Sequence, residues 1–194
     1  AELYLTGFVF LIKNHLNLFL KDYMLIDTHC HLNVIIQNQF DRSLPYNFVE
    51  LVQPIIEQAQ EAGVTKIINV GTSLQESINC IKLAHHFENC WATVGIHPND
   101  IKSDWKDVII QFNALLHDKK NKIVGIGEIG LDYHYQNFNR QLQYDTFKAQ
   151  IELALAHDLP IVIHTRDAEQ EVLDVLKTYQ QPKLRGVIHC FSED

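Results

Sequence analysis

The chain has 194 residues, of which 46% are hydrophobic, and it carries a formal net charge of −8. This is the composition of an ordinary globular protein, and the length predicts one domain. The excess of acidic residues argues against a broad basic surface that reads nucleic acid. It does not exclude a polyanionic substrate, because divalent cations bound in a buried site would supply the positive charge.

Residues 1–23 differ in character from the rest of the chain. They contain an apolar run from Leu3 to Ile12, about half of the roughly 20 residues that a bilayer-spanning helix needs. The run has no basic leader and no clear small-residue cleavage site, so a signal peptide is not indicated. We predict that Met24 is the natural start, that residues 1–23 are an N-terminal extension, and that residues 24–194 form the domain. The alternative is an N-terminal helix packed on that domain.

Short, apolar and β-branched runs alternate with helical patterns from residue 24 onward. The expected strands are 24–28, 66–71, 91–96, 123–127, 160–164 and 186–190, and such runs are typical of strands buried on both faces of a parallel sheet. The expected helices are 48–62, 74–87, 105–116, 140–157 and 168–179. Ser73 fits an N-cap and Gly63 a C-cap. Residues 33–47 are expected to form a long polar loop.

This alternation predicts a parallel sheet with crossover helices, which is either a doubly wound sheet or a barrel. No G-x-G-x-x-G follows the first strand, and no G-x-x-x-x-G-K-[ST] occurs in the sequence. Metal-ligand side chains instead follow several different strands, which is typical of barrels, whereas a doubly wound sheet concentrates its site at one switch point. We therefore predict a TIM (β/α)8 barrel that is truncated after about six βα units.

Four histidines and one glutamate lie at the ends of the expected strands, and imidazole and carboxylate groups are metal ligands. Strand side chains alternate between faces, so the two histidines that follow the first strand point the same way. Alone, the glutamate would be read as a buried salt bridge and each later histidine as a hydrogen-bonded core residue. Together they predict a metal centre formed by His29, His31, Glu128, His164 and His189.

Other polar residues lie close to these ligands and are candidates for binding substrate. Arg166 would share the face of His164 and clamp a phosphate, or else pair with a neighbouring aspartate. His97 and Asp132 are expected at the rim of the site, where Asp132 would orient a ligand histidine or contact substrate. Aromatic stacking tolerates any base in single-stranded nucleic acid, and the residues that offer it, unless they serve only in packing, are Tyr133, His134 and Phe191.

The cysteines do not indicate a further site. None of them lies in a C-x-x-C pair, so a zinc finger or a thioredoxin-like motif is not supported. In a chain without a signal peptide we expect reduced thiols that pack in the interior. The four residues are Cys30, Cys80, Cys90 and Cys190.

Five sequence blocks resemble the signature of one family. They are 24–32 (MLIDTHCHL), 94–98 (VGIHP), 127–133 (GEIGLDY), 159–168 (LPIVIHTRDA) and 189–191 (HCF). In this order they resemble the TatD family of metal-dependent deoxyribonucleases, which have a TIM-barrel fold in the amidohydrolase-like group. The resemblance runs from Met24 to the last residue.

The resemblance implies roles by position. His29 and His31 correspond to the family's H-x-H pair, Glu128 to its bridging glutamate, which we expect to be catalytic, and His164 and His189 to its later ligands. One or two divalent cations are implied, and the sequence does not decide among Mg²⁺, Mn²⁺ and Zn²⁺.

Two departures from the family pattern stand out. Asn33 occupies a position where the family usually has aspartate, and its amide cannot carry the negative charge of that aspartate. The family's Glu-Thr-Asp block, which supplies an aspartate after the seventh strand, does not occur in the sequence.

The expected activity is metal-dependent hydrolysis of DNA phosphodiester bonds in an exonuclease-like manner at single-stranded ends. The expected partner is DNA, bound weakly and without sequence specificity, and we expect a cytoplasmic protein without membrane contact that is a monomer at full length. One alternative is a small-molecule amidohydrolase or lactonase, although their common binuclear form has a carbamylated lysine where Glu128 stands. The other is an inactive fragment, because a barrel without two strands leaves two sheet edges unpaired.

Overall fold

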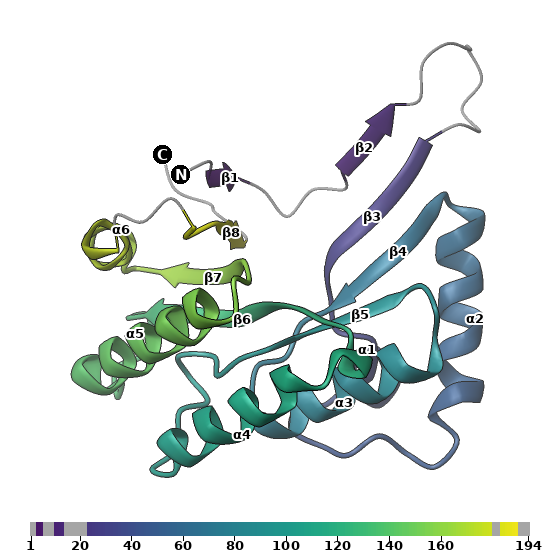
Figure 1. The fold of residues 1–194 in the computed structure, drawn as a ribbon. Coiled ribbons are helices and arrows are strands. Elements are labelled where there is room, and N and C mark those ends of the chain that lie inside the picture. The colour runs from purple at the N-terminus through teal and green to yellow at the C-terminus, as the bar shows by residue number, and fades with distance from the viewer. Residues whose placement is uncertain (1–2, 6–9, 14–22, 180–182, 190–194) are drawn as a thin grey trace.

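The structure is a computed structural model that describes residues 3–5, 10–13, 23–179 and 183–189. One eight-stranded sheet runs through it in the order β1-β8-β7-β6-β5-β4-β3-β2. Its six central strands are mutually parallel and are β3 (Tyr23–Cys30), β4 (Val64–Asn69), β5 (Cys90–Val94), β6 (Ile123–Asp132), β7 (Ile161–Arg166) and β8 (Gly186–His189). They curve into a nearly closed barrel (Figure 1), so the predicted barrel of about six βα units is confirmed.

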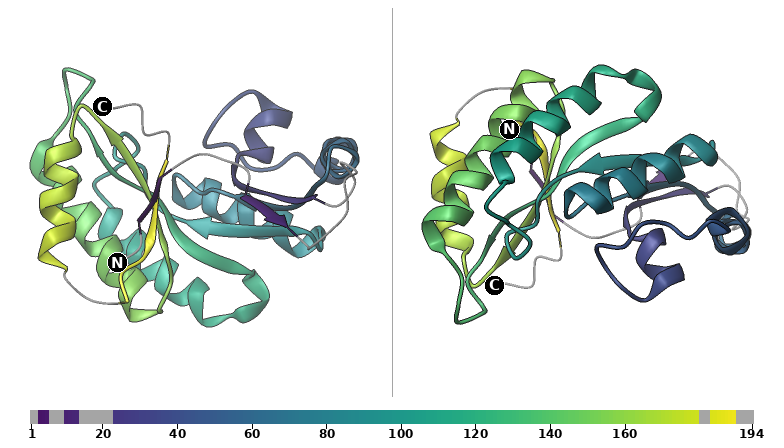
Figure 2. Two further views of the ribbon diagram at one scale, coloured as in Figure 1. Left: turned by 90° about the horizontal axis from the view of Figure 1, so that it is seen from above. Right: turned by 90° about the horizontal axis from the view of Figure 1, so that it is seen from below.

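Helices follow the parallel strands and cover the outside of the curved sheet (Figure 2). They are α1 (Leu32–Gln37), α2 (Phe48–Glu61), α3 (Leu74–His86), α4 (Trp105–His117), α5 (Arg140–Ala156) and α6 (Glu169–Thr178), with a 3₁₀ turn at Lys119–Asn121. The five helices predicted from periodicity are all present. Within the described residues, none of these helices is long and apolar enough to cross a bilayer.

The interior is built from the two faces of the sheet. The larger apolar cluster packs strand residues such as Val94, Ile126 and Ile163 against helix residues such as Phe112 and Phe147. Burial of these branched and aromatic side chains is the main favourable contribution to folding. A second cluster joins α1, α2 and α3 to β4 through Leu32, Val52, Ile56, Ile67 and Leu83.

The structure differs from the sequence predictions at two places before β4. The expected loop over residues 33–47 begins with α1, which buries Leu32 and Asn33. Within residues 1–23, the described parts are β1 (Leu3–Leu5), β2 (Phe10–Lys13) and the first residue of β3, and none of them is part of the helix of the alternative interpretation. β1 pairs parallel to β8 and β2 pairs antiparallel to β3. Both edges of the six-stranded parallel sheet therefore have a hydrogen-bonded neighbour.

Strand register determines which residues lie side by side where the strands end. Gly130 of β6 is level with His164 of β7, and His164 is level with His189 of β8. Gly130 has φ +149°, and a Cβ atom added there would lie 1.9 Å from the carbonyl oxygen of His164. No side chain fits this gap, so glycine is what allows β6 to approach β7 beside the candidate ligands.

We predict that Gly130→Ala destabilises the fold by about 3 kcal/mol, because the backbone of β7 must move to admit a methyl group. Urea denaturation followed by circular dichroism measures this loss. Gly125→Ala in the same strand is the matched control, since its Cβ would lie 3.2 Å from the nearest atom and should cost less. Equal losses in the two variants would contradict the role given to Gly130.

Candidate metal centre

Glu128 lies at the centre of a ring of histidines at the carboxyl ends of the strands. One carboxylate oxygen, Oε1, is 2.9 Å from His164 Nδ1 and 3.9 Å from His97 Nε2. The other, Oε2, is 3.5 Å from His29 Nε2. The side chain is buried, and within the described residues its ion-pair partners are all histidines. The buried salt bridge that was the alternative interpretation of Glu128 would therefore be formed with histidines, since no lysine or arginine pairs with it among the described residues.

Different strands deliver these side chains. His29 is the second-last residue of β3, and its backbone N–H donates to the Asp27 carboxylate at 3.0 Å. His31 directly precedes α1. The N–H of Glu128 donates to the carbonyl of Gly71 at 2.7 Å, which ties β6 to the loop that follows β4.

Two groups of three side chains have ligand atoms within 4.8 Å of one another. One is His29, Glu128 and His189, and the other is His97, Glu128 and His164. Glu128 belongs to both, which is the position of a carboxylate that bridges two cations. His31 lies beside the first group, with its Nε2 atom 3.2 Å from that of His29. The structure thus brings together all five predicted ligands and adds His97, which sequence analysis had placed at the rim.

The electrostatics of the ring suit cation binding. Burial lowers the pKa of His97 and that of His189 to about 4 each, and it also lowers the pKa of His31. These imidazoles are neutral at pH 7 and keep a lone pair for a metal. Burial alone would raise the pKa of Glu128, but hydrogen bonds with His164 and His29 outweigh it and hold that pKa well below the usual range. Glu128 is therefore ionised.

Three of these histidines also have one ring nitrogen without a hydrogen-bond partner, although for His29 and His31 the nitrogen that faces the other ligands is Nε2. The Nδ1 atoms of His29, His31 and His189 are buried without a hydrogen-bond partner among the described residues. Buried polar atoms are rarely left unpaired. Imidazole nitrogens that face one another and a carboxylate are ordinary ligands of Zn²⁺ or Mn²⁺, and the carboxylate also suits Mg²⁺. The residues present fit a divalent cation, and they do not select which one.

Asp132 holds His164 from the side opposite Glu128. Its Oδ2 atom is 3.1 Å from His164 Nε2 and accepts from the Asn99 side-chain amide at 2.7 Å. Burial would raise the pKa of Asp132, but these contacts and the N–H of His134 together lower it. Burial also acts to lower the pKa of His164, yet its two carboxylate neighbours raise it overall. Asp132 is placed to orient a ligand, one of the two roles expected for it.

The remaining rim residues are arranged around β6 and β7. Arg166 is exposed and forms no ion pair among the described residues, and its guanidinium carbon lies 5.7 Å from the ring centre of Tyr135. Asp167 pairs with His134 at 3.0 Å instead. Tyr133 is stacked on Phe138, with ring centres 4.7 Å apart. Phe191 and Cys190, also singled out from the sequence, lie outside the described residues.

A buried polar contact behind the metal centre escaped sequence analysis. The side-chain amide of Asn33 donates to the Glu76 carboxylate, which also accepts from the N–H of Asp41 at 2.6 Å. This carboxylate therefore anchors the loop after α1, where Phe40 packs edge-on to His31 with ring centres 5.7 Å apart. An aspartate at position 33 would place two carboxylates against each other. Asparagine there is thus matched to Glu76.

The sequence pattern around Glu76 indicates a local helix cap and not a contact with Asn33. Ser73 and Glu76 fit the S-x-x-E spacing of a capping box, and Ser73 does accept the N–H of Glu76 at 3.2 Å. A capping box would turn the Glu76 carboxylate back to the start of α3, but it turns to Asn33 instead. The two residues are 43 positions apart, so local spacing could not reveal the pair.

Fold and site together define a class of protein, a parallel β/α barrel with a histidine–carboxylate centre at the carboxyl ends of its strands. The chain belongs to the TatD-related DNase family, whose model matches residues 26–194. This confirms the family resemblance of the five sequence blocks.

Individual relatives agree with that assignment. The chain is 32% identical over 169 residues to a Bacillus subtilis protein named as the uncharacterized metal-dependent hydrolase YabD, covering 87% of this chain and 61% of that protein. It is 34% identical over 149 residues to the 3′-5′ ssDNA/RNA exonuclease TatD of Citrobacter rodentium, and the match covers 75% of this chain and 54% of that protein. The crystal structure of YJJV, a TatD homologue from Escherichia coli K12, superposes with a TM-score of 0.73 at 28% identity. The superposition covers 87% of this chain and 61% of that protein. The chain thus spans a little over half the length of these relatives.

The raised pKa of Glu76 makes stability depend on pH. Burial raises this pKa from 4.5 to about 7, so the folded state holds the proton more tightly than the unfolded state. The stabilisation that protonated Glu76 contributes is fully present below about pH 4.5 and is lost as the pH rises through about 7. The free energy of unfolding falls by about 3 kcal/mol over this range.

We predict that Glu76→Gln, which stays neutral, removes this part of the pH dependence. The unpaired Oδ1 atom of Asn33 would accept the new amide. The measurement is the free energy of unfolding at pH 5 and pH 8, and the exposed Glu61→Gln substitution should leave the difference as in the wild type. An unchanged difference in Glu76→Gln would show that Glu76 is not the group that titrates.

We predict that Glu128→Gln weakens binding of Mn²⁺ or Zn²⁺ more than about 100-fold, because it removes the charge that both ligand groups share. Asp132→Asn should weaken it by about 10- to 100-fold, the range for residues that only orient a ligand. Isothermal titration calorimetry on the metal-stripped protein measures both. Wild-type affinity in Glu128→Gln would exclude Glu128 as a ligand.

Proposed function

We propose that the protein is a metal-dependent nuclease that hydrolyses phosphodiester bonds at the ends of single-stranded DNA or RNA. The observation that carries the proposal is the Glu128 carboxylate shared by two three-ligand groups. Two cations side by side suit the opposite oxygens of a phosphodiester displacement. The names of the relatives, which include 3′-5′ ssDNA/RNA exonucleases, support the same substrate class.

The residues of the centre would have different roles in binding the cations. His29 and His189 would hold one divalent cation with Glu128, and His97 and His164 the other; such ions polarise the phosphate and acidify a bound water. Asp132 fixes the ring of His164 and so the direction of its ligand atom. Glu128 remains ionised at neutral pH and neutralises part of the charge of the ions.

Arg166 would hold the substrate rather than ligate metal. It follows His164 by two residues on β7, so both project from the same face of that strand. Its charge is not paired with any carboxylate of the described residues. An exposed guanidinium beside the centre would bind a non-bridging phosphate oxygen through paired hydrogen bonds.

We predict Mn²⁺- or Mg²⁺-dependent release of nucleotides from a 3′-labelled single-stranded oligonucleotide, with chelation abolishing it. Glu128→Gln should reduce the rate more than about 100-fold, because the charge that assembles both cations is lost. Arg166→Ala should act mainly on KM, and Arg166→Lys should recover part of the loss. Hydrolysis of a lactone panel by a metal-loaded protein that leaves the oligonucleotide intact would overturn the proposal in favour of a small-molecule hydrolase.

A further inference from the structure

A cavity of about 350 Å³ lies between the loop after β5 and the loop after β6, against the start of α5. We call it the amide–aromatic cleft; its lining residues are Pro98, Asn99, Ile101, Tyr135, Asn137, Phe138, Asn139, Leu142 and Gln143. We propose that it binds the nucleobase of the nucleotide next to the scissile phosphate. This inference rests on the proposed nuclease function and specifies where the substrate lies.

The chemistry of the lining selects an uncharged heteroaromatic ring. Although the protein is strongly acidic, none of the residues that line the cleft is charged. A second cavity, of about 310 Å³, is lined by Asp41, Asp100 and Asp104 against a single cation, Lys102, and would repel a nucleotide. Aromatic faces stack on any base, and side-chain amides bond to base edges. The first cavity has both groups. The second also has an aromatic ring and a side-chain amide, Trp105 and Gln75, so what separates the two cavities is the negative charge that lines the second.

The cleft is joined to the metal centre through Asn99. The side-chain amide of Asn99 donates to Asp132 at 2.7 Å, and its backbone N–H donates to Nδ1 of His97 at 3.1 Å. Asp132 and His97 both contact the imidazole ring of His164. A base in the cleft therefore lies one residue away from the groups that would hold the phosphate, and Arg166 stands beside Tyr135 at the same rim.

The walls of the cleft are held in place before any ligand binds. Phe138 is stacked on Tyr133. The Arg140 guanidinium lies over the Tyr133 ring, 4.7 Å from its centre. Gln143 donates to the carbonyl of Asp132 and accepts its N–H, both at 2.9 Å. Tyr135, by contrast, is 56% exposed, and Asn137 makes no side-chain hydrogen bond among the described residues. These two side chains are free to contact a base, and the rigid walls lower the entropic cost of binding.

The test compares two single-stranded oligonucleotides that differ only in the 3′-terminal nucleotide, which is intact in one and abasic in the other. With Mn²⁺ present, the wild type should show about a tenfold higher KM for the abasic substrate, the value of one stacked base. Tyr135→Ala should raise KM about tenfold for the intact substrate only, with kcat little changed. Leu142→Trp, which narrows the cleft, should act in the same direction.

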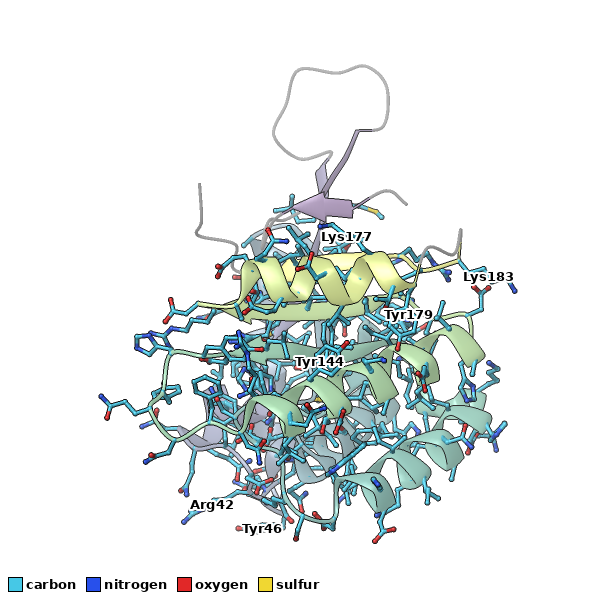
Figure 3. The ribbon with its side chains drawn as sticks, turned by 90° about the vertical axis from the view of Figure 1, so that its left-hand side faces the viewer. Arg42, Tyr46, Tyr144, Lys177, Tyr179 and Lys183 are labelled. Atoms are coloured by element: carbon cyan, nitrogen blue, oxygen red, sulfur yellow. The ribbon has the colours of Figure 1, made fainter. Side chains whose placement is uncertain are left out.

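Tyr46→Ala is the matched control. Tyr46 is 99% exposed and projects from the molecule at the end opposite α6 (Figure 3), so its loss should leave both KM values unchanged. Equal KM values for the two oligonucleotides in the wild type would overturn the cleft assignment and leave the nuclease proposal standing.

A protein that cleaves neither oligonucleotide would refute the proposed function, and the cleft would then be tested by binding alone. Titration with adenosine 5′-monophosphate, followed by calorimetry, should show affinity that Tyr135→Ala reduces about tenfold and Tyr46→Ala does not. Absence of binding, or equal binding by the wild type and Tyr135→Ala, would overturn the inference.

Discussion

The arrangement of the active end of this barrel depends on one buried carboxylate. Removing an ion from water is costly unless opposite charge and hydrogen bonds replace its hydration. Around Glu128 the replacement comes from imidazoles on β3, on β7 and after β5, two of which, His29 and His164, hydrogen-bond to it and lower its pKa. The histidines that burial keeps neutral cannot balance its charge by themselves. A divalent cation would complete this balance, and this is why the same side chains are poor core residues and good ligands.

The sheet makes this convergence possible through close strand approach. Parallel strands place their carboxyl ends at one edge, and the register sets His164 level with both Gly130 and His189. The absence of a side chain at Gly130 lets two strands come near enough for ligands from each to meet at Glu128. Backbone packing, ligand geometry and charge balance are therefore one constraint and not three separate ones.

Much of this was predictable because it is encoded locally. Alternation of short apolar runs with helical periods predicted all six parallel strands and five of the helices, and polar residues at strand ends predicted the cluster. Contacts between distant residues were not predictable. The Asn33–Glu76 pair and the link from Asn99 to Asp132 join segments that only the closed fold brings together. The strands β1 and β2 were also not predicted, because their apolar run has no alternation of polar and apolar residues that would distinguish a strand from a helix.

The strong negative charge of the chain bears on how a nucleic acid would be held. Binding driven by phosphate contacts alone requires many basic residues and weakens steeply with salt, and this protein has 24 acidic residues against 16 lysines and arginines. Under the proposed function, attraction for phosphate would come mainly from the cations and Arg166, which would act over one or two phosphates. Any further affinity has to come from uncharged contacts such as base stacking. A net negative charge on the protein would favour a chain end over a long internal stretch, because an end brings fewer phosphates into the repulsive field.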